Sequence, residues 1–222
     1  MTKFLLLFDL DGTLVDSLPD LANALNEVLR EHGHAPLDRA EVKPMIGDGM
    51  PMLLQRGFAA RGADAAEAKA AEPRFVEIYE GSATNLSRPY PGVAETLAAL
   101  REAGFSTAVA TNKPQHATAE VLRGMGLTEL FDGFAGGDRF PVRKPDPGHL
   151  LGLVELLGGD PKRTAMIGDS ENDALSARAA AMSLILMRYG YARIDPAQLG
   201  ADRVLDHFSE IPAALTALGL NP

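Results

Sequence analysis

The sequence predicts an α/β fold in which a parallel sheet, flanked by helices, is interrupted by a helical insert. Short apolar runs alternate with helical patterns along most of the 222-residue chain, as in sheets whose parallel strands are joined by helices. Between residues 16 and 89 this alternation stops, and the pattern there is helical. With 46% hydrophobic residues, the chain can bury one core of ordinary size and a smaller appended module.

Five short runs rich in β-branched or apolar residues are predicted to be the strands. They are residues 4–8, 106–110, 133–135, 164–167 and 183–187. The segments 93–103 and 115–125 carry apolar residues at helical spacing, and each stops at a glycine that suits a helix end. We therefore expect a Rossmann-like core built from residues 1–15 and 90–222.

The insert, residues 16–89, is predicted to form a helical cap over the sheet. Ser17 can cap a helix whose apolar residues share one face. Pro19 would lie in the opening turn of that helix, and Pro73 would split the Ala-rich pattern of residues 63–79 into two helices.

Composition narrows the classes of partner. A formal net charge of -9 would repel a phosphate backbone, so we expect a small metabolite as the ligand and no nucleic acid. The absence of cysteine excludes disulfides, thiolate metal sites and cysteine nucleophiles. No run approaches 18 apolar residues and no leader pattern precedes the first strand, so we expect a cytoplasmic protein without membrane contact, as a monomer or homodimer.

Polar residues stand where four of the predicted strands end or in the loops after them. Because the carboxyl ends of parallel strands meet at one edge of a sheet, ligands bind there and these residues should form one site. They are Asp9 and Asp11 in DLDGT, Thr111 in ATNKP, Lys144 in RKPDP, and Asp169 and Asp173 in GDSEND.

These four motifs resemble those of the haloacid dehalogenase superfamily. The resemblance spans nearly the whole chain in the family's order, and the insert lies where that family has its type 1 caps. Within the superfamily, the runs DLDGTLVDS, SRPYPGV, TNKP, GGD, RKPDP, GDSENDA and RYGYARIDP are most similar to bacterial phosphoglycolate phosphatases. The resemblance implies an enzyme, a magnesium-dependent phosphomonoester hydrolase that converts 2-phosphoglycolate to glycolate and phosphate.

The chemistry of a phosphate ester gives these residues their expected roles. Such an ester needs an in-line nucleophile, neutralisation of its oxygen charges and protonation of a poor leaving group. Asp9 would attack phosphorus to form an aspartyl-phosphate, and Asp11 would act as general acid and base. Thr111 would bind a phosphate oxygen, and the resemblance makes Lys144 a phosphate clamp. Further phosphate donors are expected from the amides of Leu10, Asp11 and Asn112.

A magnesium site is expected beside the nucleophile. Mg²⁺ prefers hard oxygen ligands in an octahedron that keeps some waters. Asp9, the main-chain carbonyl of Asp11 and Asp169 would bind it directly, and Asp173 directly or through water. Alternatively, Asp169 and Ser170 could cap the following helix, which does not exclude metal binding.

A second glycine-rich loop is expected in the cap. Gly47, Asp48 and Gly49 lie in the run MIGDGMPML, where the superfamily places a loop that helps select the substrate, although a plain turn explains this pattern equally well. A glycolate carboxylate would also need a cation or backbone amides. Three basic residues are candidates for the cation: Lys43, Arg56 and Lys113.

Other functions are open on the sequence alone. A phosphatase for sugar phosphates or pyrophosphate would use the same core residues. A phosphomutase would need its phospho-enzyme protected from water, and the cap lacks the Arg-x-x-x-Ser pattern of β-phosphoglucomutases. A dehalogenase would have no evident use for Asp11 or the acidic pair. A catalytically inactive binding protein on this fold is the alternative from a different class.

Overall fold

The structure is a computed structural model that describes residues 3–222, and its core is a six-stranded parallel sheet. The strand order is β5-β4-β1-β6-β7-β8. The strands are β1 (Leu5–Phe8), β4 (Ser106–Ala110), β5 (Gly133–Ala135), β6 (Thr164–Gly168), β7 (Ser183–Met187) and β8 (Arg203–Leu205). The predicted α/β class is confirmed, but the expectation of five strands is wrong because it missed β8. That strand is three residues long and partly exposed, so it lacks an apolar pattern.

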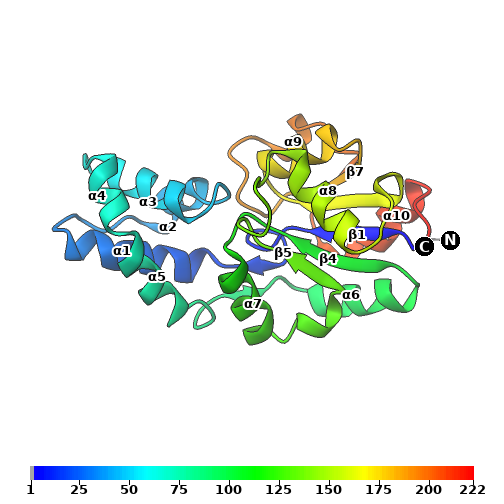
Figure 1. Ribbon diagram of the computed structural model, residues 1–222, viewed down its shortest axis with the longest axis horizontal. Helices are drawn as coiled ribbons and strands as arrows, with labels where there is room; N and C mark the ends of the chain where they lie inside the picture. The colour runs from blue at the N-terminus through cyan, green and yellow to red at the C-terminus, as the bar shows by residue number, and fades with distance from the viewer. Residues whose placement is uncertain (1–2) are drawn as a thin grey trace.

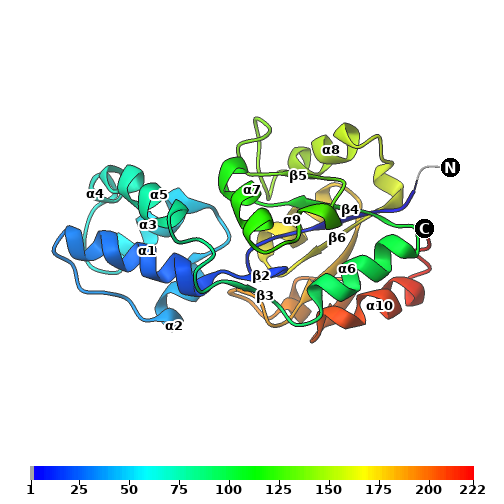
Figure 2. The same cartoon turned by 90° about the horizontal axis from the view of Figure 1, so that it is seen from below.

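The sheet is covered on both faces, which explains why its central strand is apolar throughout. Leu6 and Phe8 of β1 pack into one buried cluster, whereas Leu5 and Leu7 pack into the other. Figures 1 and 2 show helices on the two sides of the sheet. The first cluster includes residues of α6 (Val93–Glu102), α7 (Gln115–Gly124) and α10 (Ile211–Ala217), and the second those of α8 (Pro147–Leu156) and α9 (Glu171–Ala179).

Short 3₁₀ helices are η1 (Lys43–Met45), η2 (Thr128–Leu130), η3 (Pro161–Arg163), η4 (Pro196–Gln198) and η5 (Phe208–Glu210).

The insert forms a separate group of helices beyond the carboxyl end of β1, at the left of Figure 1. Its helices are α1 (Leu18–Glu31), α2 (Arg39–Val42), α3 (Met50–Ala59), α4 (Ala65–Ala70) and α5 (Glu72–Glu80). Pro19 lies in the first turn of α1, and Pro73 in the first turn of α5, just after α4 ends. The helical insert is therefore confirmed, and we call residues 16–89 the cap. Its standing as a domain with those boundaries stays a prediction.

The two ends of the cap contain strands that the sequence did not indicate. β2 (Val15–Asp16) pairs in antiparallel fashion with β3 (Arg88–Pro89), so the chain leaves and re-enters the core at adjacent points. Each strand is two residues long, too short for an alternating pattern. Just inside them, buried Asp20 accepts hydrogen bonds from the amides of Leu86 and Ser87.

The start of α1 also differs from the expectation. Ser17 occupies the N-cap position, but its hydroxyl makes no capping hydrogen bond. Its backbone is helical (φ -95°, ψ -5°), whereas capping residues are typically extended. The hydroxyl of Tyr191, from the core, accepts hydrogen bonds from the amides of Ser17 and Leu18 instead, at 2.9 and 3.0 Å.

Among residues 3–222, no helix has the length and apolar character needed to cross a membrane.

We predict that His149 of α8 makes folding sensitive to acid. Burial and the positive charge of Lys144 lower the pKa of His149 to about 4, against about 6.5 in an unfolded chain. The unfolded state then binds the extra proton between these values, so stability should fall as pH drops from 6.5 to 4, by up to about 3 kcal/mol. Urea unfolding across this window should show a shallower pH dependence for His149→Gln than for the wild type. His116→Gln, at a largely exposed site, is the matched control, and an unchanged slope in His149→Gln would contradict the assignment.

Candidate active site

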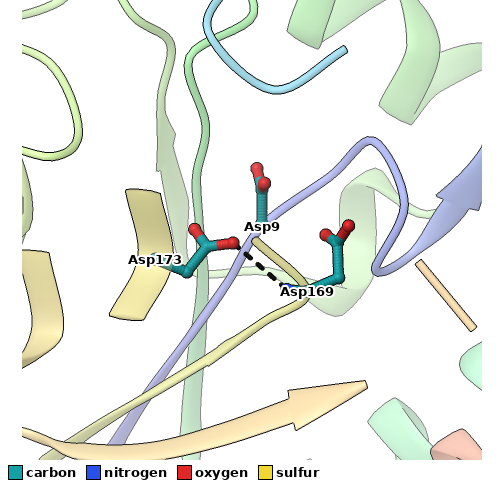
Figure 3. Close-up of side chains that lie close together, drawn as sticks. All are labelled: Asp9, Asp169 and Asp173. Carbon is teal, nitrogen blue, oxygen red and sulfur yellow. Dashed lines mark hydrogen bonds between the residues drawn. The ribbon is translucent and has the colours of Figure 1, made fainter. Parts of the chain in front are cut away.

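Asp9 ends the central strand and faces a group of acidic residues from other segments. Its side chain is almost fully buried, and Oδ1 accepts a hydrogen bond of 2.7 Å from the amide of Leu10. Burial raises the pKa of Asp9 to about 6, although the positive charge of Lys144 opposes this rise. Figure 3 shows the Asp9 carboxylate beside those of Asp169, from the loop after β6, and Asp173, from the first turn of α9.

Lys144 is the cation that holds this group together. Its Nζ lies 3.1 Å from Asp9 Oδ1 and 2.6 Å from Asp173 Oδ1, and it donates a third bond, of 2.7 Å, to the Ala110 carbonyl. The side chain is 1% exposed. Burial alone would lower the pKa of Lys144, but Asp173 and Asp9 together outweigh it and raise the pKa. Lys144 therefore stays charged where an unpaired ammonium would not be stable.

The two acidic residues after β6 have different environments. Oδ2 of Asp173 accepts bonds from the Ser170 hydroxyl and from the amides of Asp169 and Ser170, which forms a capping box at the start of α9. Asp169 instead accepts bonds of 2.7 Å from the Thr13 hydroxyl and the Tyr191 amide. Burial and the charges of Asp173 and Asp9 raise the pKa of Asp169 well above its usual range. Ser170 therefore caps helix α9, as the alternative expectation had it, but its partner in the cap is Asp173 and not Asp169.

A glycine makes the close approach to Asp169 possible. A Cβ on Gly190 would lie 2.2 Å from the Asp169 Cβ, so no larger residue fits there without displacement. The neighbouring amide of Tyr191 can therefore reach the carboxylate. Gly12, with φ of 87°, plays a similar part on the other side, where an added Cβ would meet Asp169 Oδ2 at 2.5 Å.

The acidic cluster has the composition of a site for a hard metal ion. One carboxylate oxygen from each of Asp9, Asp169 and Asp173 can be chosen so that all three lie within 4.8 Å of one another. These three residues face one cation, Lys144, so a divalent ion would counter the burial and the mutual repulsion that raise the pKa of Asp9 and Asp169. Asp173 already binds Lys144 through one oxygen and three donors through the other. This arrangement favours contact between Asp173 and a metal through water.

Asp11 lies in a second ion pair, which sequence reasoning did not foresee. Both of its carboxylate oxygens accept bonds from Lys113 Nζ, at 3.0 and 2.9 Å. The Lys113 side chain is 3% exposed, and its Nζ lies 4.7 Å from the ring centroid of Tyr79 in cap helix α5. Burial alone would lower the pKa of Lys113, but Asp11 and Tyr79 raise it. A cap residue therefore covers the ion pair of the expected acid and base.

The residues expected to bind phosphate lie around the same edge. Thr111 is buried, and its hydroxyl oxygen accepts a bond from the Lys113 amide at 3.3 Å. The side-chain amide of Asn112 donates to the carbonyls of Gly47 and Lys144, at 3.0 and 2.9 Å. The amide of Leu10, an expected phosphate donor, bonds to Asp9 here. Thr111 and Asn112 thus line the same cavity as Asp9.

The predicted cap loop closes over this edge. Gly47 and Gly49 line a cavity between cap and core, and the Gly47 carbonyl also accepts a bond from Asn172. Asp48 forms ion pairs with Arg56 of the cap and Arg193 of the core. Burial acts to raise the pKa of Asp48, but its bonds to Asn172 and Arg56 lower it overall. Asp48 thus links the cap to the core through Arg193.

The cavity beneath the cap has a volume of about 120 Å³. Its catalytic end contains Asp9, Asp11 and Thr111. Of the three basic residues considered for a substrate carboxylate, Lys113 lines the cavity, whereas Lys43 contacts the Tyr189 carbonyl and Arg56 is paired with Asp48. The remaining walls are mainly apolar and come largely from the cap: Leu21, Ile46, Met50, Leu53, Phe75 and Val76.

Some residues of the site could not be assigned from their own sequence context. Thr13 and Tyr191 both bond Asp169, and Tyr79 reaches the cavity from a helix about 70 residues away from Asp9. The run RYGYARIDP, which carries Tyr191, was noted as similar to phosphoglycolate phosphatases, but without a role for this residue. For Tyr79, the sequence offers no signal beyond its place in the helical pattern of residues 63–79, since Phe75 is a second aromatic residue of the same helix.

We predict that Lys144→Met destabilises the fold as well as the site. The change leaves Asp9 and Asp173 buried without their cation, and removing one partner of a buried pair typically costs about 3–5 kcal/mol. Urea unfolding at pH 7 measures the loss. Lys162→Met, at an exposed position, is the control and should change stability by less than about 0.5 kcal/mol. Equal stability of both variants would mean that Lys144 does not hold the carboxylates together.

Comparison with known proteins agrees with this geometry. A family model described as haloacid dehalogenase-like hydrolase matches residues 5–181. The phosphoglycolate phosphatase of Caulobacter vibrioides is 43% identical over 213 residues, which cover 95% of this chain and 90% of that protein. The crystal structure of a predicted phosphoglycolate phosphatase from Haemophilus somnus has a TM-score of 0.91 at 35% identity, over 96% of this chain and 98% of that one.

The structure of CbbY from Rhodobacter sphaeroides in complex with phosphate also matches, with a TM-score of 0.77 at 28% identity, over 96% of this chain and 99% of that one. The resemblance recognised in the motifs is thus confirmed over almost the full length. The chain belongs to the haloacid dehalogenase-like hydrolase family.

Proposed function

We propose that this hydrolase is a magnesium-dependent phosphomonoesterase that cleaves 2-phosphoglycolate through an aspartyl-phosphate on Asp9. The observation that carries the proposal is the pairing of two carboxylates with different surroundings at one cavity. Asp9 is held beside Lys144 at 3.1 Å, and Asp11 lies two residues further along the same turn, bonded to Lys113. One is placed to attack phosphorus and the other to exchange a proton with the leaving oxygen.

In the first half of the reaction, a carboxylate oxygen of Asp9 forms a bond to phosphorus while the bond from phosphorus to the ester oxygen breaks. The departing alkoxide takes a proton from Asp11. Lys144 and the Thr111 hydroxyl oppose the negative charge on the phosphoryl oxygens, and Lys144 also fixes the position of Asp9.

In the second half, Asp11 removes a proton from a water molecule, whose oxygen attacks phosphorus. The bond between phosphorus and Asp9 then breaks, which releases phosphate and restores the Asp9 carboxylate and the protonated Asp11. The cap keeps other water away, because its apolar residues close the cavity over the ester.

Asp9, the Asp11 main-chain carbonyl, Asp169 and, directly or through water, Asp173 would hold Mg²⁺. The ion would supply positive charge to the phosphoryl oxygens. The donor set supports this choice because it consists of oxygen atoms and carries more negative charge than Lys144 neutralises.

A small acid phosphate suits the cavity better than a larger ester. Its volume of about 120 Å³ is below the roughly 300–1,000 Å³ typical of pockets for drug-sized ligands. Among the described residues that line it, Lys113 is the one Lys or Arg. A single cation fits one further carboxylate, whereas a nucleotide or pyrophosphate would bring additional phosphate charge. The relative from Caulobacter vibrioides, named a phosphoglycolate phosphatase, supports glycolate as the leaving group.

Replacing Asp9 by Asn should abolish turnover while the protein stays folded. The amide has nearly the same shape but is no nucleophile, so we expect kcat to fall by at least about 10³-fold. Asp64→Asn is the matched control, because Asp64 is exposed and Asn caps a helix as well as Asp does. Phosphate release from 2-phosphoglycolate measures both variants. Substantial turnover by Asp9→Asn would rule out the aspartyl-phosphate mechanism.

Activity across a panel of esters at saturating Mg²⁺ tests substrate and cofactor together. The panel contains 2-phosphoglycolate, sugar phosphates, pyrophosphate, nucleotides and an aryl phosphate, compared by kcat/KM. We expect 2-phosphoglycolate to be preferred, and activity to disappear with a chelator and return with Mg²⁺. Mg²⁺ should also raise the temperature of thermal unfolding. At a Mg²⁺ concentration 100 times Kd, the free energy of unfolding should rise by about 2.7 kcal/mol. Preference for another ester would be compatible with the proposed mechanism but would refute 2-phosphoglycolate as the substrate. Hydrolysis that does not need a metal ion would refute the proposed Mg²⁺ site.

A further inference from the structure

The Tyr79 hydroxyl is a buried polar group without a well-formed hydrogen bond to any described residue. Tyr79 lies near the end of cap helix α5, lines the cavity and is 5% exposed. Lys113 is close enough to interact with the hydroxyl, but no acceptor for its proton is found among the described residues. Such groups are uncommon because burial removes them from water without compensation. A buried donor at a cavity wall indicates that a ligand supplies the missing acceptor.

The polar group that approaches the Tyr79 side chain is the ammonium of Lys113. It approaches Tyr79 from the face of the ring, 4.7 Å from the centroid, instead of meeting the hydroxyl in hydrogen-bond geometry. Burial raises the pKa of Tyr79, although Lys113 opposes the rise, so the phenol keeps its proton and can donate. A neutral donor and a buried cation thus stand together at one end of the cavity.

The position of this pair relative to the reacting atoms identifies its ligand. The leaving oxygen of the substrate must lie within reach of Asp11, and Lys113 bonds both oxygens of Asp11. In 2-phosphoglycolate, one methylene separates that oxygen from the carboxylate carbon. A carboxylate attached at this distance therefore lies next to Asp11, on the side where Lys113 and Tyr79 are found.

We propose that the Tyr79 hydroxyl and the Lys113 ammonium together form the subsite for the substrate's carboxylate. The inference rests on the proposed function and assigns its specificity to two residues, one from the cap and one from the core. The carboxylate accepts one hydrogen bond from each. Phe75 stacks against Tyr79, with the ring centroids 5.8 Å apart, and so restricts the orientation of the ring.

This arrangement also couples recognition to cap closure. Tyr79 moves with the cap, whereas Lys113 belongs to the loop after β4 in the core. A carboxylate that bonds both residues stabilises the closed position, in which the apolar walls exclude water. An ester of the same size without a carboxylate leaves Tyr79 unpartnered and gives less stabilisation to the closed form.

The test is the selectivity between 2-phosphoglycolate and ethyl phosphate, which is the same ester with a methyl group in place of the carboxylate. We expect Tyr79→Phe to lower the ratio of the two kcat/KM values by about 10-fold, the usual effect of losing a hydrogen bond to a charged group. The variant should fold, because phenylalanine keeps the ring contacts and removes only an unpaired hydroxyl. Tyr189→Phe is the matched control, since that hydroxyl donates to the Thr13 carbonyl and the ratio should not move.

Binding of the two esters to Asp9→Asn, with and without Tyr79→Phe, gives a second readout that is independent of turnover. The affinity for 2-phosphoglycolate should fall by about 10-fold in the double variant relative to Asp9→Asn, with a smaller change for ethyl phosphate. An unchanged selectivity ratio in an enzyme that prefers 2-phosphoglycolate would overturn the subsite and leave the proposed function standing. A wild-type enzyme that hydrolyses neither ester would overturn the proposed function itself.

Discussion

The active site depends on one buried ammonium group. Lys144 is the cation shared by Asp9, directly after β1, and by Asp173 at the start of α9. Without it, like charges at the carboxyl edge of the sheet would repel one another and draw in protons or water. Its third bond, to the Ala110 carbonyl, fixes it to the neighbouring strand β4. Three segments that are distant in the sequence are thus positioned by a single side chain.

Two buried lysines neutralise different carboxylates of the site. Lys144 pairs with Asp9 and Asp173, whereas Lys113 pairs with Asp11. Asp169 has no such partner among the described residues, and its carboxylate is held in position by the Thr13 hydroxyl and the Tyr191 amide. Asp169 is thus the carboxylate of the cluster without a cationic partner among the described residues, and it lies in the group where a metal ion is expected. In the proposed mechanism, attack, proton transfer and metal binding therefore occupy adjacent but separately stabilised positions.

Local patterns in the sequence predicted most of the core, whereas contacts between distant segments could not be predicted. The apolar runs indicated five of the six core strands, and the spacing after them placed Asp9, Thr111, Lys144 and Asp169 at one edge. The two-residue strands at the ends of the cap were too short to produce a pattern. Tyr191 substitutes for the side chain of Ser17 at the start of α1, across more than 170 residues, and Tyr79 covers Lys113 from another lobe. No periodicity encodes such contacts, because each arises only when the whole fold has brought the segments together.

The pairing of β2 with β3 has an evolutionary consequence. Because the two ends of the cap lie side by side, the core can receive an insert of almost any length at this point without a change in its own hydrogen bonding. The residues proposed to cleave the ester bond all belong to the core, while most of the apolar cavity wall belongs to the insert. Exchange or gradual alteration of that insert can therefore diversify substrate choice while the chemistry is inherited intact. In this chain, Tyr79 is the kind of position at which such divergence would take place.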